Sequence, residues 1–190
     1  MMQKPDKAKE AVKLPARHFE RGLVQVYTGT GKGKTTAALG LAIRAAGHGL
    51  RVFIAQFMKG ANYGELNTLA RISNISVKQF GQAHWVLPEH ITEDDRKAAR
   101  EGFDEARAAV LSGKYDVVVL DEINVATAWD LVPLEWLLDL IRDKPRNVEL
   151  VLTGRLARQE IIEAADLVTE MVQIKHPFEK GISARQGIEF

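Results

Sequence analysis

Apolar and polar positions follow two alternating patterns along most of this chain. Short apolar runs predict β-strands, and segments in which apolar residues return every third or fourth position predict α-helices. The strands are expected at residues 23–27, 51–57, 75–80, 117–120, 148–152 and 168–174. The helices are expected at residues 35–46, 65–71, 92–111, 133–141 and 158–165. Because the two kinds of segment alternate, we expect a doubly wound α/β fold around a mostly parallel sheet.

The most apolar run and the longest helix support this fold class. Residues 117–120 read Val-Val-Val-Leu, which fits a strand inside a parallel sheet, where helices cover both faces. In the helix at 92–111, Thr92 is a candidate N-cap, and the acidic residues that follow suit the positive end of a helix. Phe103, Ala106 and Val110 share one face of this helix, which we expect to pack on the sheet.

Two segments lack a regular pattern. Residues 1–20 are polar and charged and are interrupted by Pro5 and Pro15. They predict a flexible arm or a short docking helix, with a disordered tail as the alternative. Residues 81–91 predict an irregular connection. The rest of the chain, 21–190, has a length that suits one nucleotide-binding domain.

Composition removes several classes of function. The 26 Lys and Arg residues nearly balance the 25 Asp and Glu residues, so no strong charge favours nucleic acid or a membrane surface. The chain has no cysteine, which excludes disulfides, a thiol nucleophile and cysteine-bound metals. No apolar run approaches the roughly 20 residues that span a bilayer, and no apolar signal region is seen at the start. We therefore expect a cytoplasmic protein.

Residues 28–36 carry the clearest chemical signal. They read Thr-Gly-Thr-Gly-Lys-Gly-Lys-Thr-Thr between an apolar strand and a helix, which is the layout of a phosphate-binding loop. Glycines there let backbone N–H groups point into one hollow, and the helix N-terminus adds positive potential. The usual first glycine is replaced by Thr28, so the loop is a variant. The alternative is a glycine-rich hairpin or linker.

Each position of this loop is a candidate for binding ATP. The side chains of Lys34 and Thr35 are the candidate catalytic groups, Lys34 on phosphate oxygens and Thr35 on a magnesium ion. The full candidate set in the loop is Thr28, Gly29, Thr30, Gly31, Lys32, Gly33, Lys34, Thr35 and Thr36.

A second half of the site is expected at the end of the strand at 117–120. Asp121 and Glu122 follow this strand directly, and an acidic residue in that position faces the metal of a phosphate-binding loop. Either carboxylate, together with Thr35, is a candidate ligand for Mg²⁺ or Mn²⁺; the alternative is a pair that caps a turn. The histidines show no ligand spacing and no nucleophile motif is present, so the chemistry must depend on the nucleotide.

Several local signatures together resemble one family, the ATP:corrinoid adenosyltransferases that make coenzyme B12. They cover about residues 20–190 and lie at 21–38, Phe57-Met58-Lys59-Gly60, Gly64-Glu65, 118–123, Leu152-Thr153-Gly154-Arg155, Lys175-His176-Pro177-Phe178, Gly181 and 184–190. The resemblance implies a P-loop fold of the RecA-like class. It also implies a reaction in which the 5′-deoxyadenosyl group of ATP moves to the cobalt of a reduced corrinoid and triphosphate leaves. ATP would lie reversed in the loop, with its triphosphate as the leaving group.

The resemblance also assigns residues outside the loop. Arg155 is expected to meet phosphate, with a surface ion pair as the alternative, and Glu65 to contact ribose or the loop. Trp85 and its neighbour His84 are expected at the lower face of the corrin, where relatives use aromatic residues to displace the axial base. Relatives have a second aromatic residue where this chain has Ala83. Trp85 as an ordinary core residue remains the alternative.

The same resemblance implies partners. It implies a homodimer, reduction of the corrinoid by a flavodoxin-type or flavin reductant, and an N-terminal arm that can fold over the corrinoid. It leaves open whether the corrinoid is made or salvaged.

Two other functions fit the loop. A P-loop NTPase or small-molecule kinase would share the loop and the acidic strand end, and it would release ADP in place of triphosphate. Thymidine kinases of this architecture usually carry zinc-binding cysteines, which are absent here. A non-catalytic carrier would bind ATP and corrinoid without turnover, although the intact Lys34 and Thr35 favour an enzyme.

Overall fold

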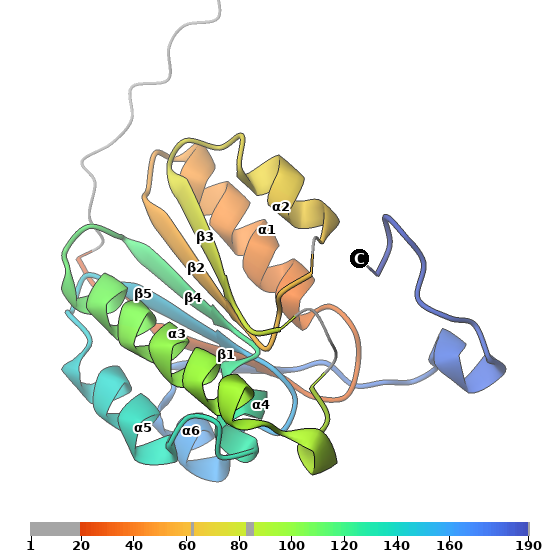
Figure 1. Ribbon diagram of the computed structural model, residues 1–190. Coiled ribbons are helices and arrows are strands. Elements are labelled where there is room, and N and C mark those ends of the chain that lie inside the picture. The colour runs from red at the N-terminus through yellow and green to blue at the C-terminus, as the bar shows by residue number, and fades with distance from the viewer. Residues whose placement is uncertain (1–19, 62, 83–85, 190) are drawn as a thin grey trace, which may run out of the picture.

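One six-stranded sheet organises the structure, a computed structural model that describes residues 20–61, 63–82 and 86–189. The strand order is β3-β2-β4-β5-β1-β6, and every pair of neighbours is parallel (Figure 1). The strands are β1 Val24–Thr28, β2 Val52–Phe57, β3 Ile75–Phe80, β4 Val117–Asp121, β5 Glu149–Thr153 and β6 Leu167–Glu170. The expected doubly wound α/β fold is confirmed, with a sheet that is wholly parallel.

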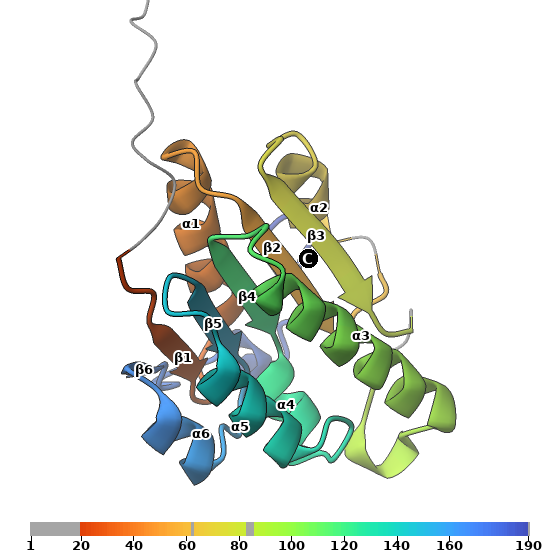
Figure 2. The same ribbon diagram turned by 90° about the vertical axis from the view of Figure 1, so that its left-hand side faces the viewer.

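Helices cover both faces of this sheet. The α-helices are α1 Lys34–Gly47, α2 Gly64–Leu69, α3 Glu93–Leu111, α4 Ile123–Ala128, α5 Leu134–Asp143 and α6 Gln159–Ala164, and short 3₁₀ helices lie at η1 Pro88–His90 and η2 Pro177–Lys180. Helices α1 and α2 lie on one face, and α3 to α6 lie on the other (Figure 2). None of the helices in the described part of the chain is long and apolar enough to cross a bilayer.

Side chains of the central strands divide between two cores. In β4, Val118 and Leu120 pack toward α3 and α5, whereas Val117 and Val119 pack toward α1. Successive residues of a strand point to opposite faces, so an uninterrupted apolar run supplies both cores at once. The expectation for residues 117–120 is therefore confirmed.

Helix α3 begins as its sequence predicts. The Thr92 hydroxyl accepts a hydrogen bond from Asp95 N at 3.2 Å, and Thr92 N donates to Asp95 Oδ2 at 3.0 Å, which forms a capping box. Phe103, Ala106 and Val110 are all buried against the sheet. The cap and the apolar face thus fix where this helix starts and how it is turned.

The structure differs from the sequence prediction at two elements, the last strand and helix α4. The last strand was expected at 168–174, but β6 ends at Glu170 because the backbone then pairs with the phosphate-binding loop: Met171 N donates to Thr28 O at 2.9 Å, and Met171 O accepts from Gly31 N at 2.6 Å. Helix α4 was not expected. Residues 123–127 of α4 are all buried, so they show no amphipathic period.

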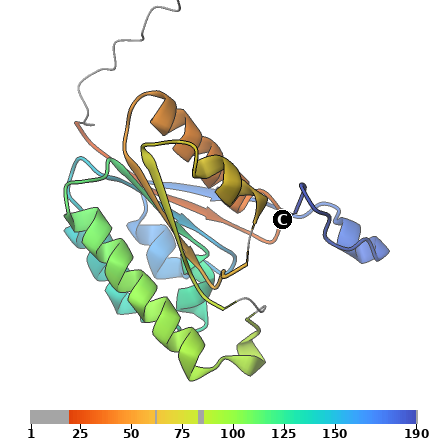
Figure 3. The ribbon, with the colours of Figure 1, turned by 45° about the horizontal axis from the view of Figure 1, so that its top comes forward.

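The C-terminal segment, residues 171–189, leaves the sheet after β6. It runs outward through η2 and turns back, so that its end lies near the start of α1 (Figure 3). Many of its apolar side chains are exposed; they are Val172, Ile174, Phe178, Ile182 and Ile188. The predicted N-terminal arm, 1–20, lies outside the described residues except for Glu20.

Two helical glycines should respond in opposite ways to alanine. A Cβ at Gly102 in α3 would lie 2.6 Å from Cγ of Phe80, whereas a Cβ at Gly40 in α1 would meet nothing within 4 Å. Gly102→Ala should therefore lower the free energy of unfolding by about 1–3 kcal/mol through overpacking. Gly40→Ala should raise it by up to about 1 kcal/mol through helix propensity. Urea unfolding measures both, and a stabilised Gly102→Ala protein would contradict this packing.

Candidate active site

The carboxyl ends of the parallel strands meet at one edge of the sheet, where ligands of open α/β sheets usually bind. In the strand order, β5 lies between β4 and β1. The loop after β1, the acidic pair at the end of β4 and residues 153–155 after β5 are therefore neighbours. The structure thus brings together the phosphate-binding loop and the acidic strand end that the sequence predicts.

The loop adopts a conformation that needs glycine, as Gly33 and Gly31 show. Gly33 precedes α1 with a φ of 114°, in the region that side chains rarely adopt. At Gly31, a Cβ would lie 2.7 Å from the carbonyl oxygen of Met171, because the C-terminal segment passes directly against the loop. A glycine-rich hairpin or linker would not need this packing, so the geometry favours a phosphate-binding loop.

Lys34 lies within the curve of the loop. Its Nζ donates hydrogen bonds to Gly29 O at 2.9 Å and to Gly31 O at 2.6 Å. Burial lowers the pKa of this ammonium, the charge of Arg155 lowers it further, and nearby carboxylates oppose the shift. A cation held only by carbonyl oxygens is available to an incoming anion, because phosphate oxygens make stronger, charge-assisted hydrogen bonds.

Among the remaining loop residues, Thr28 makes a structural contact and three others are exposed. The Thr28 hydroxyl accepts a hydrogen bond from Ala157 N at 3.4 Å, which connects the loop to the turn after β5. This contact gives a physical reason for threonine in place of the usual first glycine. Thr30, Lys32 and Thr36 are exposed.

Asp121 is the most connected polar side chain at this edge. Its Oδ1 accepts hydrogen bonds from the hydroxyls of Thr35 at 2.8 Å and Thr153 at 2.7 Å. Its Oδ2 accepts from Gln56 Nε2 at 3.2 Å and Lys59 Nζ at 2.8 Å. Each carboxylate oxygen has about two lone-pair positions, so these four donors fill the group.

Lys59 is a site residue that the sequence reasoning missed. Its ammonium pairs with Asp121, and its side chain is only 14% exposed. Burial alone would lower the pKa of Lys59, but the attraction and hydrogen bond of Asp121 dominate and raise it. The ammonium also lies 5.2 Å from the ring centre of Tyr63. The signal was present, because Lys59 belongs to the Phe57–Gly60 motif, but no role was given to it.

Gln56 connects Asp121 to two further polar side chains. Gln56 Nε2 also contacts Glu65 Oε1 at 3.4 Å, and Gln79 Nε2 donates to Gln56 Oε1 at 3.1 Å. Glu65, expected near ribose or the loop, is therefore in contact with Gln56. Gln56, Gln79 and Thr153 were not predicted, because polar residues inside strands look the same in the sequence whether they serve the fold or a site.

Glu122 differs from Asp121 in its backbone conformation and in its hydrogen bonding. It follows the end of β4 with a backbone φ of 66°, and its N–H donates to the Thr153 hydroxyl at 3.0 Å. Burial raises the pKa of its carboxyl, the Asp121 charge raises it further, and nearby cations oppose this. No hydrogen bond reaches this carboxylate from the residues that the structure describes.

Oxygen atoms at this edge of the sheet suit a magnesium ion. Thr35 and Glu122 offer the oxygen ligands that Mg²⁺ prefers, and Mg²⁺ is usually held by one or two carboxylates together with phosphate oxygens. In the described ranges no group of three or more His, Cys, Asp or Glu side chains forms a complete metal cage. A metal here would therefore need the substrate to complete its ligand shell.

An apolar cavity of about 490 Å³ adjoins the phosphate-binding edge. Arg155 and Glu122 are among its charged lining residues. The remaining lining residues are Phe57, Met58, Lys59, Gly60, Ala61, Tyr63, Gln82, Val86, Leu87, Val125, Trp129, Leu156 and Glu189. The predicted corrinoid residues His84 and Trp85 lie outside the described residues, but Gln82 and Val86, on either side of them, line this cavity.

Substitution of the two adjacent carboxylates should change the free energy of unfolding in opposite directions. Asp121→Asn should destabilise the metal-free protein by about 3 kcal/mol, because it leaves the buried Lys59 without its counter-charge. Glu122→Gln should stabilise the protein at neutral pH, because the ionised Glu122 carboxylate is disfavoured in the folded state.

The pH dependence provides the check. The gain from Glu122→Gln should be full above the raised folded pKa and disappear as the pH falls toward the ordinary value of 4.5. Chemical unfolding in the presence of a chelator, at several pH values, measures both variants. If the two substitutions changed the free energy of unfolding equally, Asp121 and Glu122 would not lie in different environments.

Comparisons with known proteins agree on one family. The family described as ATP:corrinoid adenosyltransferase BtuR/CobO/CobP matches residues 20–190. The corrinoid adenosyltransferase of Escherichia coli K12 is 36% identical, over 99% of this chain and 96% of its own length. One from a Sinorhizobium species is 37% identical, over 100% and 89%. Corrinoid adenosyltransferase CobA of Salmonella typhimurium is 34% identical, over 99% and 96%.

A solved structure supports the fold separately. A KaiC-like protein from Pyrococcus horikoshii superimposes with a TM-score of 0.56 at 19% identity, over 83% of this chain and 76% of that one. This likeness shows the RecA-like P-loop fold and no more. The match over residues 20–190 and the near full-length relatives show that this chain belongs to the ATP:corrinoid adenosyltransferase family.

Proposed function

We propose that this protein transfers the 5′-deoxyadenosyl group of ATP to the cobalt(I) of a reduced corrinoid and releases triphosphate, in the biosynthesis or salvage of coenzyme B12. Its family membership supports this reaction. The main support is that two charged residues connect the two sites: Glu122 and Arg155 line the apolar cavity, and their charges act on Lys34 in the phosphate-binding loop. A nucleotide and a large apolar cosubstrate can therefore meet between these two sites.

The reaction needs no protein nucleophile. The cobalt(I) electron pair attacks C5′ of ATP, a cobalt–carbon bond forms, and the C5′–O5′ bond breaks. The bonding electrons leave with O5′, so the departing group is triphosphate and the cobalt becomes formally cobalt(III). The protein has to hold C5′ in line with cobalt and stabilise the charge that develops on the leaving group.

The loop supplies that stabilisation. We assign the triphosphate to the hollow of residues 29–33, with the Lys34 ammonium exchanging its carbonyl partners for phosphate oxygens. Lys32 and Arg155 would add positive charge at the two sides of the hollow. This assignment uses the loop as a cradle for a leaving group, so the adenosine must point toward the cavity and away from α1.

The metal assignment distinguishes the two carboxylates. We propose Glu122 and Thr35 as the protein ligands of Mg²⁺, which would neutralise charge on the departing triphosphate. Asp121 has no free lone pair, and its contact fixes the Thr35 hydroxyl as a donor toward Asp121. The remaining lone pairs of Thr35 then face away from Asp121. Asp121 is therefore assigned as a positioning residue.

The corrinoid is assigned to the apolar cavity. Trp129, Val86 and Leu87 offer apolar contact there, and Lys59 and Tyr63 border it. Trp85 and His84 are proposed to approach the lower face of the corrin, since the chain on both sides of them lines this cavity. A homodimer, a flavodoxin-type or flavin reductant and a cytoplasmic location are proposed from family resemblance.

An anaerobic assay tests the reaction. Mixing the protein with Mg-ATP and chemically reduced cobalamin should give a light-sensitive adenosylcobalamin spectrum and one triphosphate per product. Lys34→Ala should abolish turnover without changing the fold, whereas Lys97→Ala, on the exposed side of α3, should remain active. Release of ADP and phosphate without a spectral change would instead indicate the NTPase or kinase alternative.

A pair of exposed leucines tests the cavity. Leu87 is 46% exposed and lines it, whereas Leu111 is 42% exposed at the end of α3 and does not. Leu87→Ala should raise KM for the corrinoid about fivefold, equivalent to about 1 kcal/mol of apolar contact, and leave KM for ATP unchanged. Leu111→Ala should change neither constant. Equal behaviour of the two variants would remove the cavity as the corrinoid site.

A further inference from the structure

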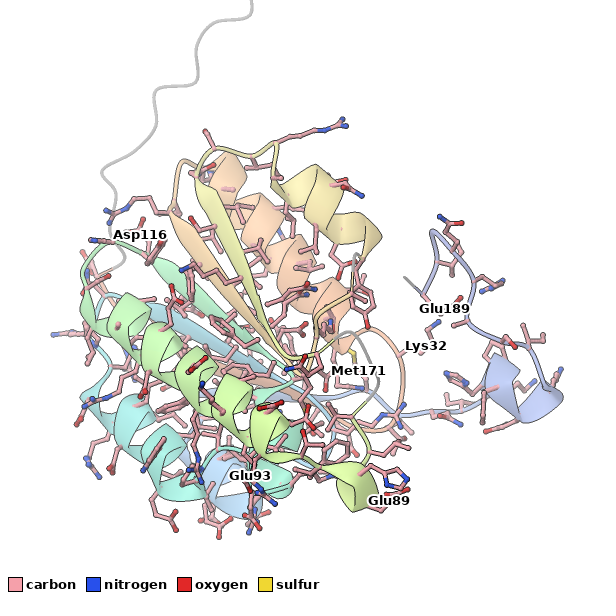
Figure 4. All side chains as sticks on the ribbon, in the orientation of Figure 1. Lys32, Glu89, Glu93, Asp116, Met171 and Glu189 are labelled. Carbon is pink, nitrogen blue, oxygen red and sulfur yellow. The ribbon has the colours of Figure 1, made fainter. Side chains whose placement is uncertain are left out.

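The C-terminal segment makes an ion pair with the phosphate-binding loop. Glu189 contacts the Lys32 ammonium through its Oε1, across 157 positions of sequence (Figure 4). The same segment touches the loop at its other end, where Met171 O accepts from Gly31 N at 2.6 Å. The segment therefore leaves the loop at Met171 and returns to it at Glu189.

The carboxylate of Glu189 accepts hydrogen bonds from Arg185, on the same segment, in addition to its contact with Lys32. Its carboxylate accepts from Arg185 N at 2.7 Å, Arg185 Nε at 3.3 Å and Arg185 Nη2 at 3.1 Å. Its side chain is only 17% exposed. The hydrogen bonds from Arg185, and then that from Lys32, lower the pKa of Glu189 to about 2. The group is thus a fixed anion at any working pH.

This anion lies at the boundary of the reaction site. Glu189 lines the apolar cavity together with Lys59, Glu122 and Arg155. Its partner Lys32 is one of the loop cations that the triphosphate of ATP would use. A carboxylate and a phosphate oxygen are equivalent partners for an ammonium, and both form charge-assisted hydrogen bonds. Two anions close to one lysine also repel each other.

We propose that Glu189 is an internal competitor of the polyphosphate. In the free protein it occupies Lys32; when triphosphate binds, Lys32 turns to phosphate and the end of the C-terminal segment is displaced. After the reaction, return of Glu189 to Lys32 assists release of the triphosphate product. The proposal rests on the proposed function, since it requires that the loop binds polyphosphate.

Binding of inorganic triphosphate tests the competition directly. Isothermal titration of the full-length protein with sodium triphosphate and Mg²⁺ should show Glu189→Gln binding about threefold to tenfold more tightly than the unchanged protein. Glu179→Gln is the matched control. Glu179 lies on the same segment, but its carboxylate accepts a hydrogen bond from Gln173 at 2.5 Å, on the segment itself. This control should bind like the unchanged protein.

A second background separates competition for Lys32 from a general effect of charge. In a Lys32→Ala protein, Glu189→Gln should give little or no gain, because the contested ammonium is gone. A full gain in this background would overturn the proposal, since it would mean that Glu189 acts only through its charge.

Three further outcomes have distinct meanings. Weaker binding by Glu189→Gln would overturn the proposal by showing that Glu189 prepares the loop for the anion. Absence of triphosphate binding by the unchanged protein would overturn the phosphate site itself, and with it both proposals. If the unchanged protein binds and Glu189→Gln binds equally well, only the competition is refuted.

Hydrogen exchange measures the displacement without any substitution. Glu189 N donates to Arg185 O at 2.9 Å and Ile188 N donates to the same oxygen at 3.2 Å. Addition of triphosphate should accelerate exchange of these two amides while the core strands stay protected. Slower exchange at both amides would show that the segment closes over the anion, which contradicts displacement.

Discussion

The site depends on the buried carboxylate of Asp121 and the four donors that converge on it. Thr35 comes from α1, Thr153 from β5, and Gln56 and Lys59 from β2 and the turn after it. One side chain therefore holds three elements at the carboxyl edge of the sheet in a fixed relation. These four donors occupy the carboxylate of Asp121, whereas the carboxylate of Glu122 receives no hydrogen bond from the residues that the structure describes.

The parallel sheet makes this convergence possible. Because β4, β5 and β1 are neighbours with the same direction, three loops from distant parts of the sequence end side by side. The backbone at Glu122 has a φ of 66°, in the left-handed region, whereas Asp121 is the last residue of strand β4. Two adjacent acidic residues thus obtain different environments, one filled by donors and one left open, as catalytic sites often require.

Local patterns predicted the loop, the strand ends and the capped helix, because glycine spacing, apolar runs and N-caps are properties of a few adjacent residues. Strand β3 has the predicted bounds, Ile75–Phe80. The pairing of Lys59 with Asp121 and of Lys32 with Glu189 could not be predicted in this way. Those contacts join positions 62 and 157 residues apart, and only the three-dimensional fold brings them together. The early end of β6 has the same cause, since Met171 leaves the strand to pair with the loop.

The proposed reaction breaks the C5′–O5′ bond of ATP, and an isotope measurement can show whether this bond is the one that breaks. ATP labelled with oxygen-18 at the 5′ bridging position would be incubated anaerobically with the protein, Mg²⁺ and reduced cobalamin, and the products analysed by mass spectrometry. Cleavage of C5′–O5′ predicts that the label leaves with the triphosphate and that the adenosyl product is unlabelled. Label retained on the nucleoside, in ADP beside unlabelled phosphate, would contradict it and would make the protein a phosphoryl-transferring P-loop enzyme.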